Sequence, residues 1–202
     1  MLVWREADPS VLGLRERKKV KTKAAIQQHA LQLIREQGFA ATTVEQIAEA
    51  AEVSPSTFFR YFPTKEDVVL YDDLDPLLAG AFAAQPADLS PIQALRGALH
   101  AVFARLPGEE LAQQWERARL ILAVPELRMR MLDQFAGTIQ LLEAMVTERV
   151  GPRADELAVR TFAGAVLGAL LAVLVAGAED PTADYLALMD ASLAYVEAGL
   201  PL

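Results

Sequence analysis

The sequence contains no cysteine at any of its 202 positions. Disulfide bonds, thiolate metal sites and cysteine nucleophiles are therefore excluded. Histidine is also scarce, because only His29 and His100 could supply an imidazole. His29 stands beside Gln28, where a solvated side chain is the common role. We find no Ser/His/Asp arrangement, glycine-rich phosphate loop or metal-ligand spacing, so we expect no catalysis, no metal and no cofactor.

Positive charge becomes rare after the first third of the chain. Residues 1–70 contain 10 Lys and Arg against 9 Asp and Glu, whereas residues 71–202 contain 9 against 18. Six of the bases lie between Arg15 and Lys23, and they include Lys19 and Lys21. A short basic segment on an acidic protein favours an anionic partner that approaches from one end. A solvated helix surface is the alternative explanation.

The chain also lacks strand-like alternation of apolar and polar residues. Apolar residues recur at helical spacing instead, and 53% of the residues are hydrophobic, which is enough for a sizeable core. The sequence therefore predicts an all-α protein. Residues 1–13 show no periodicity, and we expect a flexible arm there. No charged N-terminal region is followed by an apolar segment and a cleavage site, so we expect a cytoplasmic protein.

Start and stop signals for helices follow one another in the first seventy residues. A first helix is predicted from about Arg17 to Gln37. Thr43 can cap a second helix, with Gln46 three residues later completing a capping box. Thr64 is placed to cap a fourth helix in the same way. The third predicted helix lies between these two.

The third helix follows the second after a very short connection, residues 52–54. Ser54 is a favourable N-cap, and Pro55 suits the first helical position because its missing N–H would be unpaired there. Pro63 disfavours a helical conformation in the residue before it, so this helix should end near Tyr61. Two helices joined by three or four residues have the spacing of a helix-turn-helix.

The stretch "TFFRYFPTKEDV" combines core and surface residues on one short helix. Phe58 and Phe62 lie four positions apart and are expected to plug the small core. Phe59, Arg60 and Tyr61 are left on the outer side. The aromatic residues and the arginine can therefore share one segment without conflict.

The second helix of a helix-turn-helix enters the major groove with its N-terminal residues toward the base edges. The residues that we expect at the bases are small: Ser54, Pro55, Ser56 and Thr57. The residues that we expect at phosphates are Arg60, Tyr61 and Lys65, together with the backbone N–H groups of the helix starts at Thr43 and Ser54. The basic segment with Lys19 and Lys21 can lie along the DNA backbone or reach a minor groove.

Residues 14–72 resemble the DNA-binding domain of the TetR/AcrR family of bacterial transcriptional regulators, most specifically in "GFAATTVEQIA" and "VSPSTFFRYFPTKE". By position, the resemblance implies DNA contacts at Thr43, Pro55, Ser56, Thr57, Phe59, Tyr61 and Lys65. Many members have Tyr where this chain has Phe59, and the phosphate bond of a phenol is therefore not available there.

The remainder of the chain is also predicted to be helical. Capping and breaking signals at residues 90–91, 106–110, 125, 150–155 and 179–184 divide residues 65–200 into about six helices. The segment "RARLILAVPELRMRML", residues 117–132, is similar to the C-terminal domain of mycofactocin-locus regulators, a branch associated with acyl-CoA-type ligands. The resemblance implies a DNA-binding domain at residues 14–64, and a domain at 65–202 that binds a small effector and forms a dimer.

Several side chains of the second domain are candidates for lining an apolar effector pocket. They are His100, Phe103, Trp115, Arg119, Met129, Met131 and Phe135. Aromatic residues and methionines at helical spacing are more commonly plain core. Four arginines near Pro125, at positions 117, 119, 128 and 130, could hold an anionic group, or they could pair with the acidic residues of the domain.

The segment "FAGAVLGALLAVLVAGA", residues 162–178, is uncharged over 17 positions. A membrane span needs about 20 mostly apolar residues, and this segment is rich in Ala and Gly. We therefore expect no membrane and interpret residues 155–178 as a dimer helix, with residues 183–199 as its neighbour. Two such helices from each subunit would form a four-helix interface in a homodimer.

Together these patterns predict a ligand-responsive transcriptional regulator, commonly a repressor in this family. A dimer would bind a near-palindromic operator and leave it when a small apolar or acyl-type ligand binds. The alternative hypothesis is a helical protein-interaction module without sequence-specific DNA binding. An all-α enzyme is disfavoured by the missing catalytic constellation.

Overall fold

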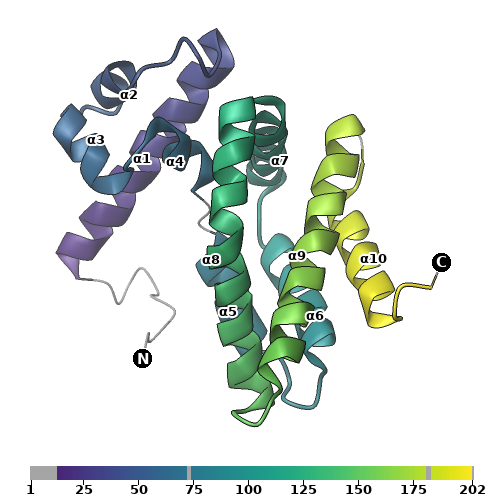
Figure 1. Ribbon diagram of the computed structural model, residues 1–202. Coiled ribbons are helices and arrows are strands. Elements are labelled where there is room, and N and C mark those ends of the chain that lie inside the picture. Colours follow the sequence, from purple (N-terminus) through teal and green to yellow (C-terminus); the bar gives the residue numbers. More distant parts are fainter. Residues whose placement is uncertain (1–12, 72–73, 181–182, 202) are drawn as a thin grey trace.

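The structure, a computed structural model, describes residues 13–71, 74–180 and 183–201. Those ranges contain ten α-helices and no strand, which confirms the predicted all-α class (Figure 1). The helices are α1 (Leu14–Gln37), α2 (Val44–Ala50), α3 (Pro55–Tyr61), α4 (Lys65–Leu70), α5 (Leu74–Ala83), α6 (Pro91–Phe103), α7 (Gly108–Ala123), α8 (Pro125–Val150), α9 (Glu156–Glu179) and α10 (Tyr185–Glu197). The predicted arm, apart from Gly13, lies outside the described residues.

The starts of the short helices follow from their caps. The Thr43 hydroxyl accepts the N–H of Gln46 at 3.2 Å, while the Thr43 N–H donates to Oε1 of Gln46 at 2.9 Å. Thr64 forms a capping box of the same kind at the start of α4. The hydroxyl of Ser54 accepts the N–H of Thr57 at 3.1 Å at the start of α3. These contacts confirm the predicted starts of α2, α3 and α4.

Helices α1 to α4 enclose one hydrophobic cluster, which we call the N-terminal cluster. Ile47, Phe58 and Phe62 are at most 2% exposed within it, so the predicted plug is confirmed. Ile121 of α7 and Leu127 of α8 belong to the same cluster. The short N-terminal helices are therefore packed directly against one end of the second half of the chain.

Helices α5 to α10 form a bundle around a second cluster that includes Leu95, Val166 and Leu193. Seven helices occupy the described part of residues 65–200, where about six were predicted. The extra break comes at Tyr71, whose extended backbone ends α4 before α5 begins. Sequence signals for this break were weak because no Pro or Gly stands between the two helices.

Helix α9 lies between α8 and α10 along one side of the bundle (Figure 1). From Glu156 to Gly177 it is long and apolar enough to cross a bilayer, judged by length and composition alone, and 22% of its most apolar window is buried. The large side chains of Leu157 and Val175 on α9, and of Tyr195 on α10, are exposed. The α9–α10 side therefore presents apolar residues that the described part of the chain leaves open.

Candidate nucleic-acid interface and interdomain cleft

The turn between α2 and α3 sets the angle of the helix-turn-helix. The N–H of Glu52 donates to the Glu49 carbonyl at 3.0 Å, and the N–H of Val53 donates to the Ala48 carbonyl at 2.9 Å. This paired pattern closes a helix with one residue in the left-handed region. Glu52 takes that position with a φ of 53°. The turn is thus defined by backbone bonds even though it lacks glycine.

The N-terminal end of α3 presents small polar groups. Ser54, Pro55 and Ser56 are exposed, and Thr57 is half-buried. The hydroxyl oxygen of Ser54 lies 2.9 Å from that of Ser56 and 3.0 Å from that of Thr57. Side chains of this size allow close approach of the backbone to base edges in a major groove. The structure therefore brings the four predicted base-contacting residues together.

The outer side of α3 continues this surface. Phe59 is 51% exposed and meets the ring of Phe58 edge to face at 5.5 Å. Arg60 is exposed, and its guanidinium lies 5.4 Å from the ring of Tyr61. Tyr61 is half-buried because part of its ring packs on the N-terminal cluster. Arg60 and Phe59 thus face outward as predicted, whereas Tyr61 bridges core and surface.

Lys65 has a different setting from the other predicted contacts. Its ammonium donates to the carbonyls of Phe39 at 2.8 Å and Thr42 at 2.9 Å. It also lies 4.1 Å from the centroid of the Phe39 ring. The side chain therefore ties the start of α4 to the connection between α1 and α2. Its contact with a phosphate remains a prediction.

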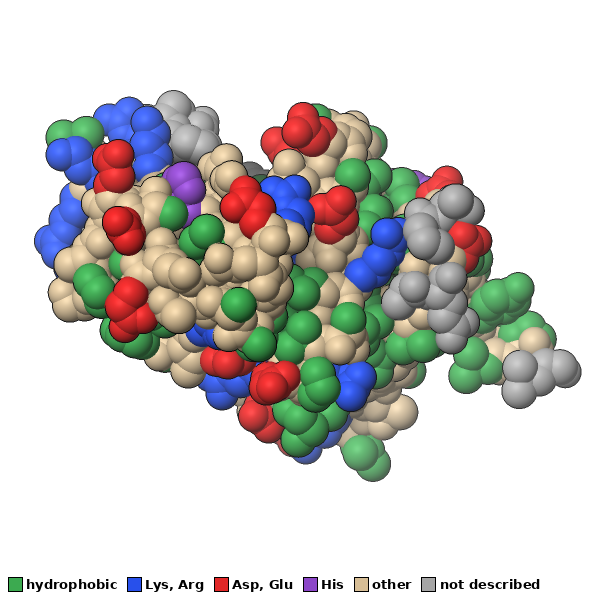
Figure 2. All heavy atoms as spheres, turned by 90° about the horizontal axis from the view of Figure 1, so that it is seen from above, with side chains coloured by type: hydrophobic (Ala, Val, Ile, Leu, Met, Phe, Trp, Pro, Cys, Tyr) green, Lys and Arg blue, Asp and Glu red, His purple; other side chains and the backbone are tan. Residues whose placement is uncertain are grey.

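The basic segment forms the first turns of α1, because this helix already begins at Leu14. Lys19 and Lys21 are exposed there, and Thr43 is exposed at the start of α2. Figure 2 shows Lys and Arg side chains gathered at the left-hand end of the molecule, over the N-terminal helices. Basic groups and the start of α3 therefore belong to the same end of the protein.

This helix-turn-helix is that of a DNA-binding transcriptional regulator. Residues 26–71 match the family of bacterial regulatory proteins called the tetR family, and residues 89–201 match the MftR C-terminal domain. The chain is 37% identical over 155 residues to the HTH-type transcriptional regulator TcmR of Streptomyces glaucescens, covering 73% of this chain and 69% of the relative. The chain therefore belongs to the TetR family, as the sequence resemblance predicted.

A second relative spans nearly the whole chain. A Mycobacterium tuberculosis protein assigned as the mycofactocin biosynthesis transcriptional regulator MftR is 29% identical over 187 residues, covering 91% of this chain and 93% of the relative. Among solved structures, FadR of Thermus thermophilus, a repressor in complex with lauroyl-CoA, has a TM-score of 0.56 at 24% identity and covers 89% of this chain and 95% of its own. FadR of Bacillus halodurans has a TM-score of 0.55 at 22% identity, covering 89% and 96%. These structures share the fold.

Three predicted pocket residues come together in the bundle. The rings of Phe103 and Trp115 stack with centroids 6.0 Å apart, and Trp115 stacks on Tyr185 at 3.9 Å. The Arg119 Nε donates to the Tyr185 hydroxyl at 3.4 Å. The Tyr185 hydroxyl in turn donates to the carbonyl of Gly177. Tyr185 was not among the predicted pocket residues, because the aromatic residues of its stack come from α6 and α7, far away in the sequence.

The other predicted pocket residues lie elsewhere. His100 is 54% exposed on α6, Met129 is exposed, and Met131 packs against the N-terminal cluster. Phe135 is half-buried on α8. None of these residues, nor the aromatic stack, lines either of the two cavities that are described below. The structure thus divides the predicted set because α6, α7 and α8 turn different faces toward the bundle.

An ionic network joins α6 to α10 beside His100. Both carboxylate oxygens of Asp190 accept bonds from Arg96, at 2.8 and 2.9 Å, and Glu197 accepts another at 2.7 Å. His100 Nε2 lies 3.2 Å from Asp190. The Arg96 guanidinium, and to a smaller extent His100, lower the pKa of Asp190 below its ordinary value. Bonding to Arg96 and Gln93 likewise lowers the pKa of Glu197.

The arginines near Pro125 bind groups of the protein itself. Arg130 of α8 holds both oxygens of Asp67 on α4, at 3.0 and 3.3 Å, and this bond raises the pKa of Arg130. Arg117 of α7 donates to the Tyr71 carbonyl at 2.5 Å. Gln27 of α1 donates to the same carbonyl at 2.8 Å. Arginines of α7 and α8 therefore bind the two ends of α4, and α1 also binds its C-terminal end.

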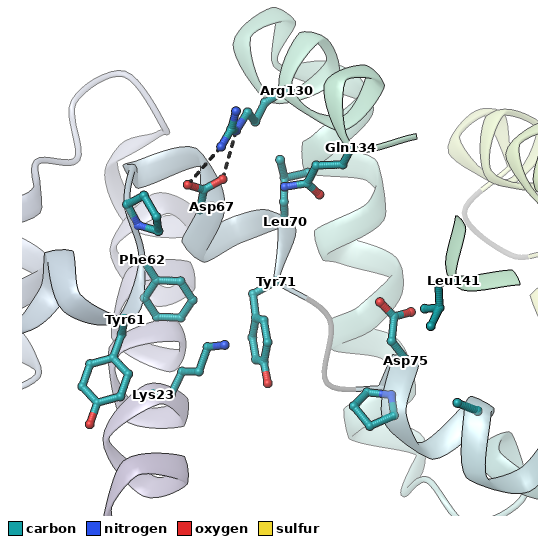
Figure 3. Close-up of a pocket in the computed structure, with 13 residues that line it drawn as sticks. Lys23, Tyr61, Phe62, Asp67, Leu70, Tyr71, Asp75, Arg130, Gln134 and Leu141 are labelled. Atoms are coloured by element: carbon teal, nitrogen blue, oxygen red, sulfur yellow. Dashed lines mark hydrogen bonds and ion pairs between the residues drawn. The ribbon is translucent and has the colours of Figure 1, made fainter. Parts of the chain in front are cut away.

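A cleft of about 610 Å³ lies beside these contacts (Figure 3). Figure 3 shows Phe62 and Tyr71 on the side of the N-terminal helices, with Lys23 directed toward Tyr71, and Asp75 and Leu141 on the bundle side. The lining residues come from α1, from the end of α3 through α5, and from α8: Lys23, Tyr61, Phe62, Pro63, Asp67, Leu70, Tyr71, Asp75, Pro76, Ala79, Arg130, Gln134 and Leu141. We call this the interdomain cleft.

Proposed function

We propose that this TetR-family protein is a transcriptional repressor that binds a near-palindromic operator as a homodimer. The supporting observation is the exposed start of α3, where Ser54 and Ser56 stand outward at the end of the molecule that carries the basic turns of α1. Small groups can reach base edges while Lys19 and Lys21 neutralise phosphates. Both kinds of contact are then available to one helix-turn-helix.

The dimer would form through α9 and α10. A groove of about 530 Å³ lies on this side, lined by Ala165, Ala169, Ala172, Ser192, Tyr195, Val196, Leu200 and Pro201. Its small residues allow close helix packing, and the exposed Tyr195 offers a large apolar group to a second copy. A two-fold axis here would place the two α3 helices in successive major grooves, about 34 Å apart.

The effector is proposed to be a small apolar or acyl-type molecule. Its support is the similarity of the fold to that of Thermus FadR, whose structure contains lauroyl-CoA, and the Ala- and Leu-rich bundle. Arg117 and Arg130 provide the link to the DNA-binding helices, because they hold the two ends of α4. A ligand that moves α7 or α8 would move α4 and change the separation of the α3 helices.

Selection of bound duplexes from a random pool, using the purified full chain, tests this function. We expect a palindromic consensus, a two-to-one ratio of protein to duplex, and affinity that falls steeply with salt. Thr57→Ala should change the base preference of the protein. Arg60→Ala should weaken binding to all sequences alike and reduce the slope of log affinity against log salt concentration by about 1. Absence of any enriched sequence at low salt would contradict the proposal and favour a protein-interaction module.

A further inference from the structure

The interdomain cleft has the size and position of a ligand site. Its volume of about 610 Å³ lies within the range of roughly 300–1,000 Å³ that is usual for small-molecule sites. One wall is formed by Tyr61, Phe62 and Tyr71, which connect directly to the helix-turn-helix. The opposite wall is formed by α5 and α8 of the bundle. A molecule bound there would touch both halves of the chain at once.

The chemistry of the lining indicates what it would bind. The half-buried rings of Tyr61 and Tyr71 and the aliphatic side chains of Leu70 and Leu141 provide apolar surface, whereas Phe62 is only 2% exposed. The charged lining residues are two bases and two acids: Lys23, Arg130, Asp67 and Asp75. Lys23 is positioned on aromatic faces, with its ammonium 3.4 Å from the Tyr71 ring centroid and 5.4 Å from that of Phe62. This balanced set offers no surplus of positive charge to a polyanion.

We propose that the interdomain cleft binds a flat, mainly apolar molecule without net charge, and that this molecule is an effector of DNA binding. The effector role rests on the repressor function proposed above, whereas the binding site does not. Aromatic rings recognise flat apolar molecules by stacking, and the exposed Gln134, which lines the cleft, offers an amide for hydrogen bonds.

The contacts around the cleft explain how a bound molecule would change the position of the DNA-binding helices. Helix α4 has six residues and depends on tertiary contacts for its stability. The Asp67–Arg130 pair joins α4 to α8 at one edge of the cleft. Tyr71 also lines the cleft, and its carbonyl accepts bonds from Gln27 and Arg117. An occupant that displaces Tyr71 or separates Asp67 from Arg130 therefore shifts α4 against α1.

The neutral fluorescent probe N-phenyl-1-naphthylamine tests the site in the full-length protein. Ala79→Trp fills the cleft from α5, and Gln134→Trp does so from α8 at an exposed position that tolerates a large side chain. Ala136→Trp is the matched control, because Ala136 is exposed on α8 and does not line the cleft. Circular dichroism verifies that each variant is folded. If Ala79→Trp does not fold, probe binding to Gln134→Trp alone tests the site.

We expect the probe to bind the wild type and the Ala136→Trp variant equally, and the cleft-filling variants at least about tenfold more weakly. Equal binding to all variants would overturn the site. Lauroyl-coenzyme A, a polyanion, serves as the second probe. If the cleft-filling variants lose this compound and retain the neutral probe, the proposed ligand class is wrong.

Coupling is measured with the selected operator duplex. Saturating N-phenyl-1-naphthylamine should weaken operator binding by about fivefold or more in the wild type and have no effect in the Gln134→Trp variant. An unchanged operator affinity in the wild type would refute the effector role. Failure of the repressor function has a different signature, because the protein would then bind no duplex at all while probe binding remained sensitive to the cleft.

Discussion

The N-terminal helices and the α9–α10 side of the bundle differ in how far their apolar residues are buried within one chain. In the N-terminal cluster, Phe58 and Ile47 are fully buried on helices of seven residues each. On α9, 24 residues long, most of the apolar window remains accessible. The N-terminal helices bury their apolar residues within one chain, with large side chains and helix caps. The α9–α10 side has a surface of small apolar residues that, in the proposed dimer, is buried only when a second copy packs against it.

The largest effect is expected from the core of the N-terminal cluster. Phe58→Ala should lower the free energy of unfolding by about 3–5 kcal/mol and abolish DNA binding, because the cavity cannot collapse around three short helices. Phe59→Ala, one position along and 51% exposed, is the control and should cost less than about 1 kcal/mol. Urea unfolding measures both. A similar loss of unfolding free energy in both variants would contradict the division of α3 into a buried face and an exposed face.

A charge on the α9 face tests the other half of the comparison. Ala172→Arg places an unpaired charge in the groove beside α10, and burial of such a charge in an interface costs about 3–5 kcal/mol. We expect monomers by light scattering at micromolar concentration, with the fold retained. Ala136→Arg on α8 is the matched control and should remain dimeric. A dimeric Ala172→Arg variant would show that α9 does not form the interface.

Lys65 allows structural and electrostatic roles to be separated within the N-terminal region. Lys65→Met removes two bonds to carbonyls and should destabilise the protein by about 1–3 kcal/mol. Because the Lys65 ammonium already binds two carbonyls, we expect operator affinity to fall while the slope of log affinity against log salt stays unchanged, a result that would overturn the phosphate contact predicted from the sequence. Lys19→Met should leave stability unchanged and reduce that slope by about 1. A reduced slope in Lys65→Met would show that this residue neutralises a phosphate after all.

The smallest effect is expected from the ionic network between α6 and α10. Because the folded-state pKa of Asp190 is lowered, its contribution is present above the ordinary carboxyl pKa of 3.8 and is lost as pH falls through the folded value. The carboxyl is partly exposed, so Asp190→Asn should cost roughly 0.5–1 kcal/mol at pH 6. That difference should shrink toward pH 3 in urea unfolding. A constant difference across this range would exclude the ion pair as its cause.

Much of the N-terminal region could be predicted because its signals are local. A capping box needs residues three positions apart, and Pro55 and Pro63 act on their immediate neighbours. The predicted pocket residues depended on contacts between distant helices, and only part of that set came together. Tyr185 lies seventy positions from Trp115, so periodicity in either helix could not reveal the stack. The role of Lys65 as a link to the α1–α2 connection was hidden for the same reason.

By itself, the sequence determined the helical class, the start of each short helix and the two faces of α3, because these depend on spacing along one chain segment. The TetR-family membership followed from the same local motifs. Tertiary structure alone decided which helices share a core, how Arg117 and Arg130 hold α4, and where a cleft opens between the two halves. Those features arise from side chains that meet across long sequence separations, and such meetings are set by packing of whole helices.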